Sequence, residues 1–250
     1  GMTTDSGWLI HKRPQGDSSL YLTLFTAEHG LIRALYKGAR NLKKKSALQG
    51  FVPLWLEWTN RQEYFFIRRA ELQNSPLQLN GTALICAMYV NELIYLCLKQ
   101  PEASPDLYAN YEYTLMELEQ CTEPAAMSII LRQFEWALLH HCGAGFPLTT
   151  DIHSDPIDSN KFYQFLPQSG FVSAPNGIPG HCIIAIRNNQ LAHAEVLQVA
   201  KQVMRSAIDD LVDYKPLQSR KLLTTRQQPI NAPGLQKTEF LDNAPLPSSG

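Results

Sequence analysis

The sequence predicts a multidomain α+β protein, with a small five-stranded β-barrel, then an α-helical middle domain, then a small β subdomain followed by C-terminal helices. Short strand-like segments crowd the first seventy residues, and segments with helical spacing of apolar residues follow. The charge pattern changes with these regions. Residues 1–71 hold eleven Lys and Arg against six Asp and Glu, residues 72–160 hold two against eleven, and residues 161–250 hold nine against six. The formal net charge of −1 is therefore the sum of a basic first region, an acidic middle region and a basic last region. Regions of opposite charge suggest different binding partners.

Composition excludes several classes of protein. A hydrophobic fraction of 44% in 250 residues is too high for a chain that is disordered throughout. No apolar run approaches the roughly 18–20 residues that span a membrane, and the start carries no apolar stretch typical of a signal peptide. The five cysteines are widely spaced, without a C-x-x-C pair, which is typical of reduced thiols. We therefore expect a cytoplasmic protein without a membrane partner.

The barrel is predicted from five segments rich in leucine, aromatic and β-branched residues, separated by turn residues. Within the second segment, Leu20, Leu22 and Leu24 are expected on one face, because strand side chains alternate. The five predicted strands are 8–13, 19–26, 31–37, 51–58 and 63–69.

The loop between the third and fourth strands carries the strongest charge signal. Residues 37–50, KGARNLKKKSALQG, contain five cations and no acid. Such a loop can neutralise phosphates and release counterions, although many charge runs are simply solvated surface. The candidate DNA-binding residues are Arg13, Arg33, Lys37, Arg40, Lys43, Lys44 and Lys45. Aromatic residues that could stack on bases are Trp8, Tyr21, Tyr36, Tyr64 and Phe66, although each is individually more typical of a core.

Three helices are expected in the acidic middle, over about 80–100, 105–120 and 124–142. Arg132 is the rare cation there. It can form an ion pair with Glu135 one turn away, or it can anchor an acidic peptide tail, and the sequence leaves both open.

Beyond the middle domain, residues 161–166 and 170–173 are predicted to pair as a hairpin, and 193–213 to form a helix. A short segment, LQSRKLL, follows. The expected division of the chain is 2–72 (barrel), 79–148 (helical domain), 149–192 (irregular β subdomain), 193–227 (C-terminal helices packing on the helical domain) and 228–250 (flexible tail).

No motif gives a positive reason to expect an enzyme. Phosphate-loop, dinucleotide-binding, G-x-S-x-G and H-E-x-x-H patterns are absent from the sequence. Asp151, His153, Asp155 and Asp158 form a loose cluster whose spacing matches no defined metal site, so an acidic loop is favoured. A metal-dependent nuclease using Asp151, Asp155 and Asp158 is the enzymatic alternative.

Six stretches in this order and spacing resemble the bacterial RecO family of DNA repair proteins, from about Trp8 to Arg226. They are HKRPQGDSSLYLTLFTAEHG (11–30), KGAR (37–40), FVPL (51–54), VNEL (90–93), LRQFEWALL (131–139) and KPLQSRKLL (215–223).

This resemblance implies an N-terminal OB-fold, a helical domain and a C-terminal region with a zinc module. It also implies a non-catalytic recombination mediator in the response to DNA damage, acting in the cytoplasm at the nucleoid. Such a protein binds single- and double-stranded DNA, anneals complementary strands, acts with RecR and RecF, and helps to load RecA on DNA coated by single-strand-binding protein (SSB). The basic motif of the family falls on Lys37 and Arg40, and the arginine that could receive the acidic SSB tail falls on Arg132. A protein-interaction adaptor without direct DNA contact is the alternative.

One departure from the family concerns zinc. Many members carry two C-x-x-C pairs after the helical domain, whereas residues 149–182 hold only Cys182. We therefore expect no cofactor and no structural zinc. The aromatic residues expected to hold this region by packing are Phe162, Tyr163, Phe165 and Phe171.

Overall fold

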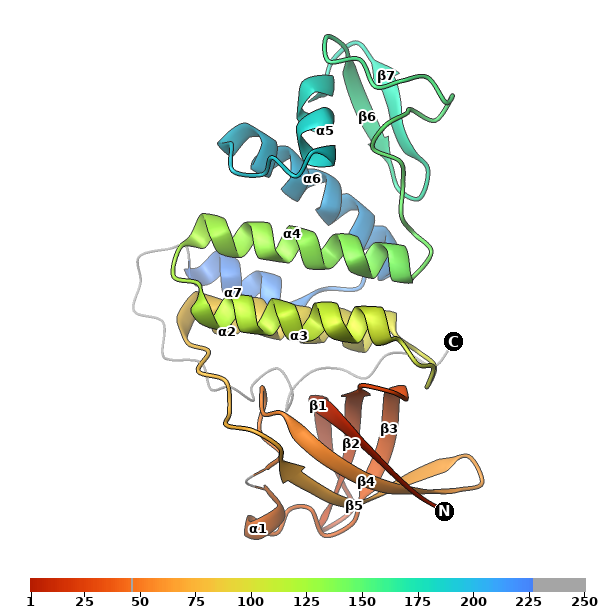
Figure 1. The fold of residues 1–250 in the computed structure, drawn as a ribbon, viewed down its shortest axis with the longest axis vertical. Coiled ribbons are helices and arrows are strands. Elements are labelled where there is room, and N and C mark those ends of the chain that lie inside the picture. The colour runs from red at the N-terminus through yellow and green to blue at the C-terminus, as the bar shows by residue number, and fades with distance from the viewer. Residues whose placement is uncertain (46, 227–250) are drawn as a thin grey trace. The chain divides into compact units, whose positions relative to one another are not determined.

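The computed structural model describes residues 1–45 and 47–226, without the side chains of Leu42, Lys43, Thr225 and Arg226. The chain divides into two compact units. The first, which we call the barrel unit, contains the described residues of 1–120 together with 217–226. The second unit contains residues 121–216. The expected flexible tail, 228–250, lies outside the described residues (Figure 1).

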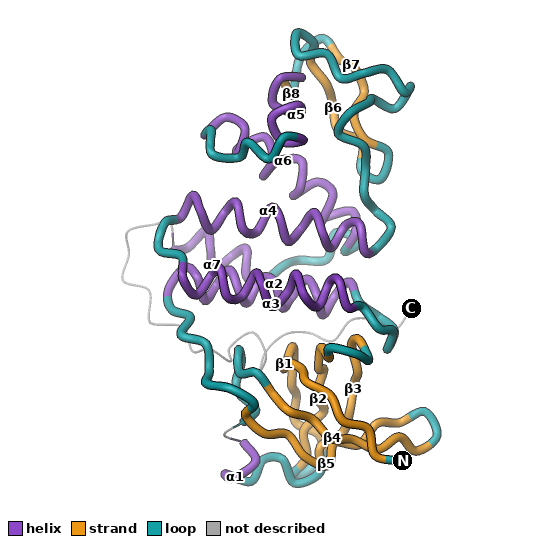
Figure 2. Tube along the Cα trace, viewed as in Figure 1, coloured by secondary structure: helices purple, strands orange, loops and turns teal. Residues whose placement is uncertain are grey.

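Five strands of the barrel unit close into a barrel in the order β1-β2-β3-β5-β4, with β4 pairing back to β1. The pairings are antiparallel except for β3 with β5, which is parallel. This is the five-stranded barrel that the strand pattern predicts, and its topology is that of an OB-fold (Figure 2). The strands are β1 (Met2–Gln15), β2 (Ser19–Thr26), β3 (Gly30–Tyr36), β4 (Leu54–Arg61) and β5 (Tyr64–Leu72), and a short helix, α1 (Leu42–Lys45), lies between β3 and β4.

The alternation predicted for β2 is confirmed. Leu20, Leu22 and Leu24 are all buried, and they stand opposite Tyr36, Ala34 and Ile32 on β3. Because facing strands share this buried row, Tyr36 belongs to the core and is not available as a stacking platform, which corrects one of the aromatic candidates.

The outer face of β1–β3 is covered by two helices of the same unit, α2 (Gly81–Cys97) and α3 (Pro105–Gln120). Phe25 makes edge contacts with Tyr108 and Tyr111, at ring-centroid distances of 5.2 and 5.5 Å. Trp8 packs edge-on against Tyr111, and its indole N–H donates to Glu112 Oε2 at 3.1 Å. Trp8 is therefore a second aromatic candidate that the structure assigns to packing, since it is only 2% exposed.

The last described helix, α7 (Gln218–Arg226), returns to the barrel unit and packs on α2. Its start is held by the buried carboxylate of Glu92, which accepts hydrogen bonds from the Gln218 and Ser219 amides and from the Ser219 hydroxyl, at 2.8, 3.2 and 2.7 Å. Burial raises the pKa of Glu92, while these hydrogen bonds lower it. An anion at a helix N-terminus is favourable, because the first amides lack partners within the helix.

The second unit contains three helices and a small sheet. The predicted hairpin is confirmed as β6 (Phe162–Leu166) paired with β7 (Gly170–Ala174), and β8 (Ile178–Pro179) adds a third strand. The helices are α4 (Pro124–His141), α5 (Gly180–Arg187) and α6 (Ala194–Leu211). Helix α5 was not expected, because the glycine- and proline-rich stretch before it suggested irregular structure. The two helices expected at the C-terminal end are shared between the units, since α6 packs on α4 and α7 packs on α2.

Aromatic side chains form the core beneath the small sheet. Phe146, Phe165 and Phe171 contact one another at centroid distances of 4.6 to 5.9 Å, and Tyr163 is also buried. Phe162, which was expected to join this core, is 43% exposed instead, because its strand presents alternate side chains to opposite faces.

Candidate nucleic-acid interface

The cationic loop is tied to the turn between β1 and β2. The Arg40 amide donates to Ser18 O at 3.1 Å, and the Arg40 guanidinium donates to the carbonyl of Gly16. The loop that follows β3 and the β1–β2 turn therefore lie together at one end of the barrel. Arg40 thus contacts Gly16 and Ser18, which are more than twenty positions away in the chain.

Several predicted cations gather at this end over aromatic rings. Lys37 Nζ lies 5.5 Å from the Phe66 ring centre, Lys44 Nζ lies 5.1 Å from that of Tyr36, and Arg13 lies 4.8 Å from that of Tyr21. A cation over a ring face is held in position without losing its charge. Lys45 is exposed in the same short helix.

Among the described residues, the hydrogen bonds of Arg13, Arg40 and Lys44 go to neutral oxygens. Lys44 Nζ donates to Lys37 O at 3.3 Å, and Arg13 Nη1 donates to the side-chain amide of Gln15 at 3.2 Å. Elsewhere on the barrel, Arg69 is paired with two carboxylates, Glu71 at 2.6 Å and Glu57 at 3.8 Å. The loop cations therefore keep their positive charge for an external anion, whereas Arg69 is already neutralised by its neighbours.

Four buried donors of the barrel unit lack acceptors among the described residues. They are Arg13 Nε, Arg40 Nε, Asn91 Nδ2 and the hydroxyl of Tyr95. Burial raises the pKa of Tyr95 to about 12, although nearby Arg33 and Arg13 act to lower it. Unsatisfied buried donors are uncommon in folded proteins, and an ordered water can supply the acceptor that such a donor lacks.

Arg33 has a different environment from the loop cations. Its guanidinium donates to Lys99 O at 3.5 Å and lies 5.9 Å from the ring centre of Tyr95. It therefore contacts the C-terminal end of α2, and the structure does not bring it into the loop cluster. The side chain of Lys43 is outside the described part of the chain.

In the second unit, Arg132 forms the internal ion pair with Glu135 that the sequence left open, and its Nη1 donates to Ser128 Oγ at 3.2 Å. The same arginine lines a cavity of about 270 Å³ between α4, α5 and α6. The walls are largely apolar, and a second cation, Arg187, stands at the end of α5. The lining residues are Arg132, Gln133, Trp136, Leu148, Ile186, Arg187, Asn189, Leu191, Ala200 and Met204.

The contribution of Arg187 to this cavity was missed because its helix was missed. The signal available in the sequence was the apolar spacing of Cys182, Ile183 and Ile186 after Gly180. Two arginines in an apolar cavity can hold a ligand that combines a carboxylate with a hydrophobic side chain.

Two of the aspartates proposed for a nuclease accept hydrogen bonds from nearby backbone amides and so stabilise the local turns. Asp151 Oδ1 accepts the amides of His153 and Asp155 at 2.9 and 3.0 Å, and Asp158 Oδ1 accepts the amide of Asn160 at 2.9 Å. Among the described residues, the groups of three side chains that could hold a metal lie elsewhere, at His181–Cys182–Glu195 and at Asp5–Glu28–His29. The acidic-loop interpretation therefore fits better than the nuclease alternative.

The barrel topology defines a protein of the OB-fold class, here with a cationic loop and half-exposed aromatic rings on the barrel and with a second unit of helices and a small sheet. Family models described as recombination protein O N terminal and C terminal match residues 2–76 and 78–220. The chain belongs to the RecO family of DNA repair proteins.

Individual relatives are similar over most of the chain. It is 38% identical over 225 residues to the DNA repair protein RecO of Legionella pneumophila (strain Corby), covering 88% of this chain and 98% of that protein. It is 34% identical to RecO of Alteromonas mediterranea over 230 residues, covering 88% and 97%. It is 32% identical to RecO of Coxiella burnetii (strain RSA 493 / Nine Mile phase I) over 227 residues, covering 88% and 96%. No helix within residues 1–45 and 47–226 is long and apolar enough to cross a membrane.

Proposed function

We propose that this protein is a non-catalytic recombination mediator that binds single- and double-stranded DNA with its barrel unit. The observation that carries the proposal is the cluster of Arg13, Lys37, Arg40 and Lys44 at one end of the barrel, bonded to neutral carbonyl and amide oxygens and to aromatic rings. Cations of this kind supply affinity for phosphates without reading sequence, because they release condensed counterions. Lys43 and Lys45 would extend the same surface, and Arg33, which lies against α2 outside this cluster, would make a separate contact with DNA.

Strand annealing follows from this mode of binding. The loop cations would screen the phosphates of two strands, while half-exposed rings such as Tyr21 and Phe66 hold bases only by stacking. Stacked bases keep their pairing edges free for a complementary strand. The same contacts would let the protein act on gapped DNA in the bacterial cytoplasm, at the nucleoid, where RecR would act with it and RecA would be loaded.

A salt titration of DNA binding tests the proposal directly. With about four phosphate contacts on single-stranded DNA, the affinity should fall about 50-fold between about 50 and 200 mM salt. Fluorescence anisotropy of a labelled oligonucleotide measures this. Changing Lys43, Lys44 and Lys45 to Glu should reduce both the affinity and the salt dependence.

A flat salt response, or unchanged affinity in the triple variant, would contradict DNA binding by the loop. Retained binding to partner proteins with no measurable DNA affinity would instead support the adaptor alternative. Arg69→Gln is the matched control, because Arg69 is already paired with Glu57 and Glu71 and should add little to DNA affinity.

A second function is favoured by the cavity of the second unit. We propose that Arg132, together with Arg187, receives the acidic C-terminal tail of SSB, with the apolar walls holding a hydrophobic side chain of the tail. Arginine suits a terminal carboxylate because its planar donors match the two oxygens. Titration of a labelled tail peptide, with and without its terminal carboxylate, would measure this interaction, and equal affinity for both peptides would exclude the carboxylate anchor.

We further propose that the region 149–192 folds without a structural zinc of the four-cysteine kind. Support comes from the aromatic core of Phe146, Phe165 and Phe171, which fills the space beneath the hairpin. Protein freed of metal by a strong chelator should then still unfold cooperatively and keep the circular-dichroism spectrum of the folded state, whereas loss of the folded state on chelation would contradict the proposal.

A further inference from the structure

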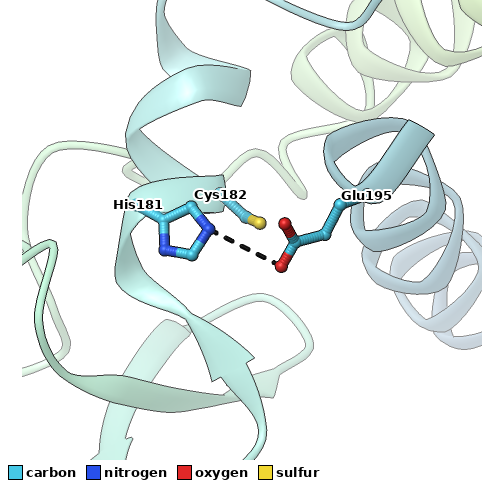
Figure 3. A group of neighbouring side chains, drawn as sticks. All are labelled: His181, Cys182 and Glu195. Carbon is cyan, nitrogen blue, oxygen red and sulfur yellow. Dashed lines mark ion pairs between the residues drawn. The ribbon is translucent and has the colours of Figure 1, made fainter. Parts of the chain in front are cut away.

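Three side chains with metal-binding atoms meet where two helices of the second unit begin (Figure 3). His181 and Cys182 lie in the first turn of α5, and Glu195 lies in the first turn of α6. His181 Nε2 is 3.5 Å from Glu195 Oε1, and the three ligand atoms all lie within 4.8 Å of one another. Figure 3 shows the imidazole and the sulfur of Cys182 directed toward the carboxylate.

One of the three separations already fits a tetrahedral ion, and the other two are at most 4.8 Å. Ligands that stand about 2.0–2.3 Å from a metal at tetrahedral angles are about 3.3–3.7 Å apart. The His181–Glu195 distance of 3.5 Å is already within this range. Adjacent residues on a helix point about 100° apart, so His181 and Cys182 alone could not enclose an ion. Glu195 from the neighbouring helix completes the group.

The start of α5 is held firmly by its backbone. The Gly180 amide donates to Lys161 O at 2.8 Å, and a Cβ at Gly180 would stand only 1.9 Å from the carbonyl oxygen of Asp158. Only a glycine therefore allows this close approach of the chain at the start of α5.

The three ligands differ in chemistry and in burial. Nitrogen, sulfur and oxygen together suit Zn²⁺ and similar transition ions, whereas Mg²⁺ and Ca²⁺ prefer oxygen alone. Cys182 is fully buried, while the His181 and Glu195 side chains are 57% and 63% exposed. An ion held here would be reached from solvent and would keep one coordination position open for water.

We propose that His181, Cys182 and Glu195 bind one divalent transition-metal ion of the zinc class on the folded protein. This site differs from the four-cysteine module in its ligands, and it ties α5 to α6 without being required for folding. Its three ligands are different residues from those assigned above to DNA and to the peptide tail.

Metal binding would displace one proton from this site. Burial and the neighbouring Glu195 carboxylate raise the pKa of the Cys182 thiol to about 11, so the thiol is protonated at neutral pH without a metal. When the ion binds, the sulfur–metal bond forms and the thiol proton leaves to solvent or buffer, since the thiolate is the ligand.

Titration of the tag-free full-length protein with Co²⁺ tests the proposal. One equivalent should bind and produce a thiolate-to-cobalt charge-transfer band in the near ultraviolet, and added Zn²⁺ should remove that band by displacement. Because both side chains are exposed, His181→Asn and Glu195→Gln should fold normally and weaken Co²⁺ binding by at least about 10–100-fold. Cys182→Ser should abolish the band.

Two variants serve as matched controls. His193→Asn changes an exposed histidine just before α6, and Cys142→Ser changes another cysteine of the same unit; both should keep the band and the affinity. Absence of the charge-transfer band in the unchanged protein would overturn the proposal. Affinity unchanged by His181→Asn and Glu195→Gln, or lost equally in His193→Asn, would overturn it as well.

Discussion

The two units use arginine and lysine in opposite ways. At the end of the barrel, Lys37, Arg40 and Lys44 contact carbonyl oxygens and rings, so their charge is available to solvent. In the second unit, Arg132 is 8% exposed and is paired with Glu135, so its charge is compensated inside the protein. The barrel surface therefore suits long-range attraction of a polyanion, whereas the cavity suits short-range recognition of one group. A residue's charge predicts little about binding until its partners are known.

The largest effect is expected from breaking the buried ion pair between Arg132 and Glu135. Replacing Glu135 by Ala leaves the Arg132 guanidinium buried without its counter-charge, which should lower the free energy of unfolding of the second unit by about 3–5 kcal/mol. Urea denaturation followed by circular dichroism would measure it. Glu71→Gln is the matched control, because it removes an exposed partner of the exposed Arg69 and should cost far less stability. Similar losses in both variants would show that burial of the Arg132 pair is unimportant.

Charge reversal on the barrel should have the next largest effect. This effect is on DNA affinity and not on the stability of the fold. Lys37→Glu with Lys44→Glu should weaken DNA binding about 100-fold at low salt, because two cations that we propose to contact phosphates become repulsive. The control is Arg68→Glu with Arg69→Glu, which makes the same change in net charge on β5. If both double variants lose the same affinity, only overall charge matters and the loop has no special role.

A smaller effect is expected from Arg132→Lys, which keeps the positive charge but loses the planar donor geometry. Affinity for an SSB tail peptide should fall about tenfold, equivalent to about 1.4 kcal/mol, while DNA affinity stays the same. Isothermal titration calorimetry with the peptide and anisotropy with DNA provide the two readings. A parallel loss of DNA affinity would show that the two surfaces do not act separately.

The smallest effect is expected from Tyr21→Leu, which keeps apolar bulk but removes a ring beside Arg13. Loss of one stacking contact should weaken single-stranded DNA binding by about 1 kcal/mol, or about fivefold, and should leave duplex binding almost unchanged. Competition between the two forms of DNA measures the difference. Equal losses for both forms would mean that Tyr21 only positions Arg13.

Much of the fold could be predicted from local patterns. The alternation of Leu20, Leu22 and Leu24 marks a strand with one buried face, and the proline starts at Pro105 and Pro124 mark helices, because these signals depend only on neighbouring residues. Helix α5 escaped prediction because Pro179 and Gly180, which usually interrupt helices, stand at its beginning here. The candidate site was predicted more coarsely, as a charged loop without its supporting turn at Gly16 and Ser18.

The sequence by itself determined the family, the order of barrel and helices, and the presence of a cationic loop, since each of these depends on local composition and spacing. Only the tertiary structure decided which of these residues are free to bind. It buried Trp8 beneath α3, set Arg33 against α2, and paired Arg132 with Glu135 beside a cavity. The physical reason is that exposure and charge compensation depend on contacts between segments distant in the chain. Arg33 and Lys99, or Glu92 and Ser219, meet only when the unit has folded.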